Sequence, residues 1–273
     1  MKNLKIAISA PVKDNIYSFM VAKSCISEPG VEVVGVFALK LWSLKRIVNE
    51  FIRLRSRLLI KIWQKYFSES INEIRNDTTT GFSYENIDQE EANLESLCLK
   101  NSIPFEYFED PNDEKAINFL EDLKPDVILS IGSVILEEQF LDVPKTGVLN
   151  VHMGILPEYR GIGVTEWPII ESSSLEDIKI GISLHIVERG VDTGPIILKK
   201  KIKIDQNDTI ESIEEKFLPQ MIEAMLTGVR LARDGKLKYQ KQEQNTESRQ
   251  YYFLHPRLRK KARIKLRKLI NES

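Results

Sequence analysis

The chain has 273 residues, of which 42% are hydrophobic and 29% are charged, and its formal net charge is −1 at pH 7. This balance is typical of a soluble globular protein, and it excludes a collagen-like chain, a disordered chain and a dedicated DNA-binding protein. We find no apolar run of about 18 residues that could span a membrane and no secretory signal in residues 1–15, so we expect a cytoplasmic protein. The two cysteines, Cys25 and Cys98, lack the spacing of metal ligands. We therefore predict two buried thiols and no metal.

Strand and helix patterns alternate at the start of the chain. Residues 4–10 and 31–39 are β-forming runs, and residues 15–28 between them can form a helix. This β-α-β opening predicts a parallel sheet. The turn after the first run, residues 9–14, contains no glycine. It therefore lacks the G-x-G-x-x-G loop of dinucleotide-binding proteins, which disfavours NAD or ATP as a ligand.

Residues 41–67 predict a basic amphipathic helix, because apolar residues recur at helical spacing and Glu50 is the single acidic residue among many basic ones. Two interpretations stay open. The helix packs its apolar side on the body of the protein or on the partner in a homodimer, which we favour. Alternatively, it contacts an anionic ligand or a membrane surface.

The alternation resumes after a flexible connection at residues 76–84. We predict helices at residues 89–100 and 113–123, strands at 104–108 and 127–131, and a helical turn at 135–141. Pro219 lies inside the helical pattern of residues 208–234 and predicts a kink or a break. The tail, residues 257–268, holds eight basic residues, and we predict that it forms a frayed or partner-bound helix.

A short strand at residues 148–151 delivers an amide and an imidazole to its end. Gly147 and Gly154 bound this strand. Side chains alternate along a strand, so Asn150 and His152 point to the same face. Acyl transfer needs a donor for the developing oxyanion and a group that moves a proton, and this pair can supply both. The alternative is an asparagine that serves a turn and a histidine packed at the surface.

A second stretch predicts a strand pair joined by a turn that carries an aspartate. Residues 178–186 alternate with one fully apolar face, and residues 196–204 return as the partner strand. Asp192 lies between Gly190 and Gly194, where it could reach a histidine on a neighbouring strand. Taken alone, it is a turn-forming aspartate. The alternation places His185 on the polar face, so we predict that His185 is dispensable.

Together these stretches resemble the signature of the folate-dependent formyltransferases, which include methionyl-tRNA formyltransferase, glycinamide ribonucleotide transformylase and the sugar N-formyltransferases. The likeness covers residues 100–235 and, more loosely, residues 1–40. It implies N10-formyltetrahydrofolate as the formyl donor and a catalytic trio of Asn150, His152 and Asp192. The motifs that carry it are Asn150-x-His152, Leu156-Pro157 with Tyr159-Arg160-Gly161, and Val191-Asp192-Thr193-Gly194.

The resemblance also implies a slot for the cofactor and a side for the acceptor. The slot lies between a first segment, residues 132–141, and a second segment, the turn at residues 188–194. The residues expected to line it are Ile135, Leu136, Glu188, Gly190 and Val191. The alternative for the first segment is a plain loop between a strand and a helix. The residues expected on the acceptor side are Tyr159, Arg160 and Trp167, although burial statistics favour a core position for a lone tryptophan.

We therefore predict a doubly wound, mostly parallel α/β domain of the Rossmann-like formyltransferase type over residues 1–205. The basic helix at 41–67 is an insertion, and residues 206–273 form a helical extension with a basic tail.

The expected activity is transfer of a formyl group to a primary amine of a small molecule, such as a nucleotide-linked amino sugar. The glycine-free turn at residues 9–14 disfavours glycinamide ribonucleotide. Too few residues remain for a separate β-barrel domain like that of methionyl-tRNA formyltransferase. Three alternatives stay open: activity of the methionyl-tRNA formyltransferase type, hydrolysis of formyltetrahydrofolate, and a non-catalytic binding module on the same fold.

Overall fold

The computed structural model describes residues 3–40, 93–132, 134–243, 248–252 and 254–272. Within these residues, seven strands form one sheet in the order β3-β2-β1-β4-β5-β7-β8. The pairs from β3 to β5 are parallel, whereas β7 pairs antiparallel with both β5 and β8. The strands are β1 (Leu4–Ala10), β2 (Val31–Leu39), β3 (Phe105–Phe108), β4 (Val127–Ser130), β5 (Gly147–His152), β7 (Gly181–Ile186) and β8 (Ile196–Lys201).

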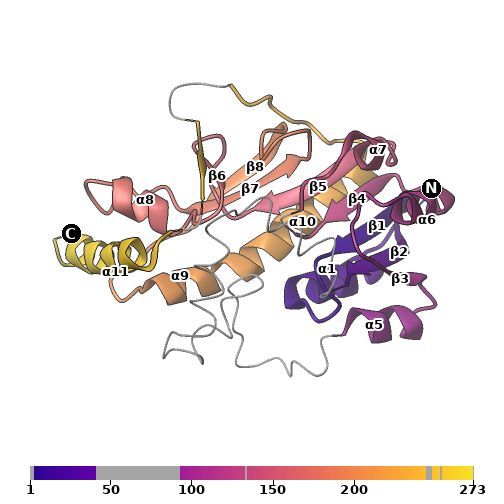
Figure 1. Ribbon diagram of the computed structural model, residues 1–273, viewed down its shortest axis with the longest axis horizontal. Helices are drawn as coiled ribbons and strands as arrows, with labels where there is room; N and C mark the ends of the chain where they lie inside the picture. The colour runs from indigo at the N-terminus through magenta and orange to yellow at the C-terminus, as the bar shows by residue number, and fades with distance from the viewer. Residues whose placement is uncertain (1–2, 41–92, 133, 244–247, 253, 273) are drawn as a thin grey trace.

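Helices cover both faces of this sheet (Figure 1), as expected for a doubly wound fold. One face carries α1 (Ile16–Ile26), α5 (Leu94–Lys100) and α10 (Phe217–Arg233), whose buried side chains join a single large apolar cluster. The other face carries α6 (Glu114–Leu123) and α7 (Glu138–Leu141), which enclose a smaller cluster. The mostly parallel α/β sheet predicted from the sequence is therefore confirmed.

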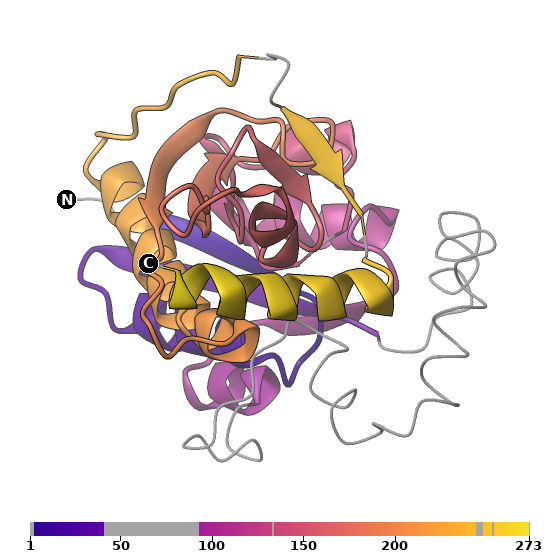
Figure 2. The same cartoon turned by 90° about the vertical axis from the view of Figure 1, so that its left-hand side faces the viewer.

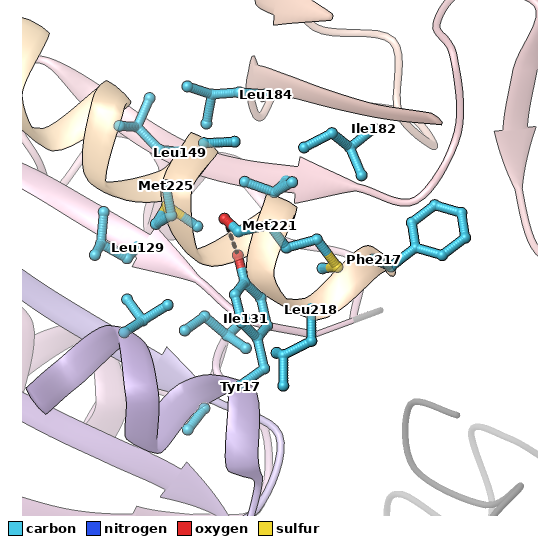
Figure 3. Packing of buried hydrophobic residues seen from close by; sticks show 14 of the residues in the cluster. Tyr17, Leu129, Ile131, Leu149, Ile182, Leu184, Phe217, Leu218, Met221 and Met225 are labelled. Carbon is cyan, nitrogen blue, oxygen red and sulfur yellow. Dashed lines mark hydrogen bonds between the residues drawn. The ribbon is translucent and has the colours of Figure 1, made fainter. Parts of the chain in front are cut away.

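The larger cluster joins distant parts of the chain. Figure 3 shows α10 lying over Leu149 of β5 and Leu184 of β7, with Tyr17 of α1 beside Met221. The Tyr17 hydroxyl donates a hydrogen bond of 3.4 Å to the Met221 carbonyl. Burying each large apolar side chain is worth about 1.5–3 kcal/mol, so the shared cluster fixes α10 against the sheet.

The helical pattern of residues 208–234 is broken, as Pro219 predicted. α9 (Ile210–Glu215) ends at Glu215, Lys216 separates the two helices, and α10 begins at Phe217, so Pro219 lies in the first turn of α10. A proline is tolerated there because the first N–H groups of a helix have no partner within the helix. The break lets both helices bury apolar residues in the same cluster.

The basic tail forms α11 (Pro256–Asn271), which packs against α8 (Glu166–Glu171) and lies across one end of the molecule (Figure 2). The prediction of a frayed or partner-bound helix was wrong, because the apolar stripe of α11 is buried within its own chain at Ala262, Leu266, Leu269 and Ile270. Arg259 Nε also donates to the buried carboxylate of Glu166 over 2.7 Å.

Several other predictions have different outcomes. Cys25 and Cys98 are free and buried, as expected, and burial raises the pKa of Cys98 to about 11.

The basic helix predicted at residues 41–67 lies outside the described residues. None of the described helices has the length and apolarity to cross a membrane. Side chains from α9, α10 and α11 share the main apolar cluster with the sheet, and the division predicted at residue 205 stays a prediction.

Candidate active site

Polar side chains gather at the carboxyl end of β5. Residues 148, 150 and 152 point away from α10, because Leu149 and Val151 fill the cluster under that helix. β7 runs antiparallel beside β5, with Asn150 opposite His185 and His152 opposite Ser183. Residues directly opposite each other share a face of the sheet, so all four side chains lie on the same side.

His152 is the centre of the group and is 8% exposed. Its Nδ1 atom lies 3.5 Å from Asp192 Oδ2. Its Nε2 atom donates to the Tyr159 carbonyl over 2.8 Å. Both ring nitrogens therefore face oxygen acceptors, an arrangement that a fully protonated ring can satisfy on both sides.

The loop after β5 passes directly beneath the His152 ring. A Cβ atom at Gly154 would lie 2.6 Å from His152 Nε2 and 2.5 Å from the Tyr159 carbonyl oxygen, so only glycine fits. Ser183 holds the same loop, since its hydroxyl donates to the Gly154 carbonyl over 2.7 Å and accepts from the Leu156 N–H over 3.0 Å. This loop supplies the Tyr159 carbonyl that binds His152.

Asp192 reaches the site from the turn between β7 and β8. Its carboxylate lies between two imidazoles, with Oδ1 3.8 Å from His185 Nε2, and Oδ2 accepts from the Gly161 N–H over 2.9 Å. The turn is tight, because a Cβ atom at Gly194 would lie 1.8 Å from the Ile186 carbonyl oxygen. The predicted approach of Asp192 to a histidine on a neighbouring strand is confirmed.

His185 belongs to the same group of side chains, and the prediction that it is dispensable stays a prediction that its position no longer supports. Its side chain does lie on the face opposite the apolar stripe, as alternation predicts, but that face carries the site. His185 Nδ1 donates to the Ile186 carbonyl over 3.0 Å, which leaves Nε2 to accept from the Asn150 amide over 3.3 Å. Burial lowers the pKa of His185 to about 4, which favours this neutral form.

The residues expected on the acceptor side divide into two kinds. Tyr159 and Trp167 pack with Tyr251 in a small aromatic cluster beside the site, with ring centroids 5.3 and 5.4 Å from that of Tyr251. The Tyr159 hydroxyl donates to Glu171 over 3.3 Å.

Arg160 differs from these aromatic residues, because its Nε atom is buried and has no hydrogen-bond partner among the described residues. Buried polar groups are normally satisfied, so this atom is a candidate donor to a ligand.

The two segments expected to flank the cofactor are joined by an ion pair. Arg189, next to Glu188 and Gly190, lies 2.8 Å from the Glu138 carboxylate of α7. Glu188 and Gly190 are exposed, and Val191 is half-buried. The other segment borders a cleft at the carboxyl ends of β1 and β4, where the strand order reverses and open α/β sheets bind ligands. The cleft is lined by Ser9, Pro11, Gly132, Val134 and Leu136.

Comparison with known proteins shows the family of the chain. The sequence model of the formyl transferase family matches residues 85–229, which is more than half of the chain. The chain belongs to the formyl transferase family.

Curated relatives of this formyl transferase include methionyl-tRNA formyltransferase of Clostridioides difficile (strain 630), which is 32% identical over 143 residues, covering 52% of the chain and 45% of the relative. A second is the bifunctional polymyxin resistance protein ArnA of Wigglesworthia glossinidia brevipalpis, 35% identical over 126 residues, covering 46% of the chain and 19% of the relative. The chain therefore spans less than half of the length of the curated relatives that it matches.

Solved structures share the fold of this formyl transferase. Phosphoribosylglycinamide formyltransferase from Anaplasma phagocytophilum superposes with a TM-score of 0.60 at 18% identity, covering 92% of this chain and 99% of that chain. The sugar 3N-formyl transferase WlaRD gives a TM-score of 0.56 at 18% identity, covering 92% and 70%. These likenesses show the fold alone.

Sequence reasoning identified the trio but not all of its surroundings. His185 had a usable signal, since it occupies the site face of a strand predicted beside the Asn150 strand. The backbone carbonyl of Tyr159 and the side chain of Gln242, which donates to the Asp192 and Gly194 carbonyls, had none. Both contacts depend on how distant segments fold together.

Proposed function

We propose that the protein transfers a formyl group from N10-formyltetrahydrofolate to a primary amine of a small molecule. One observation carries the proposal: Asn150 and His152 of β5 and Asp192 of the β7–β8 turn gather at one end of the sheet of a formyl transferase fold. An amide donor beside an imidazole that is paired with a carboxylate supplies the groups that acyl transfer to an amine requires.

The residues beside the cleft suit the folate donor. Val134 and Ile135 expose 36% and 53% of their surface, and Val134 and Leu136 line the cleft. Exposed aliphatic side chains beside a cleft can cover the face of a flat heterocycle. Ile135, Leu136, Glu188, Gly190 and Val191 are the residues that we propose would hold the donor. When bound, the donor supplies an activated formyl carbon for attack by the amine.

Each member of the trio has a distinct task in the proposed reaction. The Asn150 amide places one N–H on His185, which leaves its second N–H for the oxygen that becomes negative as the amine adds to the formyl carbon. The protonated His152 ring stabilises the same charge. Asp192 orients that ring through Nδ1. The amine must lose a proton as its bond to the formyl carbon forms, and the donor nitrogen must gain one as its own bond to that carbon breaks. His152 would give its Nε2 proton to the departing nitrogen and take up the amine proton, after Nε2 has released the Tyr159 carbonyl.

Arg160 supports an acceptor that carries a negative group. Its buried Nε atom has no hydrogen-bond partner among the described residues, and an arginine is well suited to bind phosphate. A nucleotide-linked amino sugar combines a primary amine with phosphate groups, so we propose this class of acceptor. Tyr159 and Trp167 would then shape the acceptor side through the aromatic cluster.

A formyl-transfer assay tests the proposal. The whole chain is incubated with N10-formyltetrahydrofolate and one of three acceptors: nucleotide-linked amino sugars, glycinamide ribonucleotide or methionyl-tRNA. Mass spectrometry then detects addition of one formyl group. We expect addition to the amino sugar nucleotides and none with the His152→Ala variant. Release of formate without an acceptor would indicate hydrolysis, and no product with any acceptor would contradict catalysis.

A further inference from the structure

The turn that carries Asp192 has an unfavourable backbone conformation. Asp192 has a φ of +53°, in the left-handed region that residues other than glycine seldom adopt. It is one of three non-glycine residues with positive φ in the described part of the chain, and the only one of these in the site. Such a conformation persists when the surroundings determine it. The groups that hold this turn therefore also decide where the carboxylate lies.

Besides the two histidines, two residues from outside the turn hold it in place. The Gly161 N–H donates to the carboxylate over 2.9 Å and fixes its end. The Gln242 side chain fixes the backbone: its Nε2 atom donates to the Asp192 carbonyl over 2.9 Å and to the Gly194 carbonyl over 2.6 Å. A primary amide has two N–H groups, so a single glutamine can satisfy both carbonyls at once.

Gln242 is itself anchored to the sheet. Two residues earlier, the backbone N–H and carbonyl of Gln240 exchange hydrogen bonds of 2.8 Å with Ile196, at the start of β8. The Gln242 side chain is therefore presented from a segment fixed beside the Asp192 turn, and the residue is half-buried. Gln240, by contrast, is exposed.

We infer that Gln242 is a positioning residue for Asp192. By fixing the two carbonyls of the turn, it keeps the Asp192 carboxylate between His152 and His185. The catalytic part of this inference rests on the proposed function, whereas the positioning part concerns the protein without substrate. Gln242 touches none of the reacting groups and acts through Asp192.

Kinetics of substituted proteins test the catalytic part. Gln242→Met keeps the length of the side chain but removes both N–H donors, and we expect kcat to fall about 10- to 100-fold, since small displacements of catalytic groups have effects of this size. The acceptor KM should change little. Gln242→Lys retains N–H donors and should keep most of the activity. Gln240→Met is the matched control and should behave as wild type.

A double-mutant cycle separates positioning from a general structural role. In an Asp192→Asn background, Gln242→Met should add little further loss, because the carboxylate that it positions is already absent. Independent, multiplicative losses of kcat would overturn the inference. So would equal activity of the Gln242→Met and wild-type proteins.

Nuclear magnetic resonance of the histidine rings tests the positioning part without any substrate. The chain has three histidines, His152, His185 and His255, and His255 lies at the start of α11, outside the site. Gln242→Met should shift the ring signals of His152 and His185 in the direction that Asp192→Asn shifts them, with His255 unchanged. Unchanged His152 and His185 signals would refute positioning, whether or not the wild-type protein transfers formyl groups. Absence of transfer by the wild-type protein would count against the proposed function alone.

Discussion

Asn150 and His185 face each other across the β5–β7 pair, and the Asn150 amide nitrogen lies 3.3 Å from His185 Nε2. His185 Nδ1 is held by the Ile186 carbonyl, so Nε2 can only accept, and the Asn150 nitrogen must point toward it. The neutral histidine thus decides which way the amide is turned. An asparagine turned the other way would present its oxygen to the developing negative charge.

We predict that His185→Ala impairs catalysis, because Asn150 loses the partner that orients it. Leaving a buried polar group without its partner costs about 1–3 kcal/mol, which corresponds to about a 5- to 150-fold loss of kcat if the whole effect falls on the transition state. Steady-state kinetics on protein shown to be folded by circular dichroism measures this. His255→Ala is the control and should retain full activity. Wild-type kcat in His185→Ala would refute the orienting role.

We predict that stability falls at mildly acidic pH because of His185. Burial lowers the pKa of His185 from its ordinary 6.5 to about 4. Between these two pH values, His185 binds a proton in the unfolded chain but not in the folded chain. The free energy of unfolding therefore has its full value above pH 6.5 and falls as the pH drops toward 4. The loss between pH 7 and pH 5 should be about 2 kcal/mol.

Urea unfolding at pH 7 and pH 5 measures this loss. The His185→Gln variant provides the comparison, since it keeps all other titrating groups. The variant should lose less stability than the wild-type protein over the same interval. Equal losses would mean that His185 does not set the pH dependence.

We predict that Asp192→Asn abolishes most of the turnover while preserving the fold. Asparagine tolerates the left-handed φ of +53° as well as aspartate does, whereas alanine would add backbone strain. The loss of the negative charge beside His152 should lower kcat about 100- to 10,000-fold, the range of general acid–base contributions. Retention of near wild-type kcat by this variant, or by a folded His152→Ala variant, would eliminate the assigned trio.

We predict that Gly154→Ala damages the site through His152. The added Cβ atom would lie 2.6 Å from His152 Nε2 and 2.5 Å from the Tyr159 carbonyl oxygen. The histidine and the turn must then separate, and kcat should fall about 10-fold or more because the ring moves. Gly235→Ala is a control in open space: its positive φ should cost about 1 kcal/mol of stability but leave kcat unchanged.

The fold was largely predictable because its elements follow local pattern. The bounds of β1 and β2 agree with the predicted runs at residues 4–10 and 31–39. β7 is a partial miss, since it begins at Gly181 rather than at residue 178. Ile178 and Ile180 are buried all the same, and the Ile180 carbonyl accepts from the Ile202 N–H over 2.9 Å, so the apolar periodicity there indicates burial beyond the regular strand.

The site was predictable where its residues lie within short motifs and unpredictable where it depends on distant segments. Asn150, His152 and Asp192 occupy recognisable patterns. Gln242 reaches the Asp192 turn from a stretch with no periodicity, and the role of Tyr159 depends on its carbonyl, which any residue possesses. The apolar stripe of α11 is visible in the sequence at helical spacing, but a stripe alone does not show that the helix packs on α8.

The pairing of β6 (Tyr159–Gly161) with β9 (Arg249–Tyr251) has a consequence for the order of folding. The parallel contact joins segments that are far apart in the chain, so closing it carries a large loop-entropy cost and depends on prior formation of the sheet. We therefore expect refolding chains to recover their helical signal before their catalytic activity. A nearly native chain that has not closed this pair would be well folded by spectroscopy and still be an inactive enzyme.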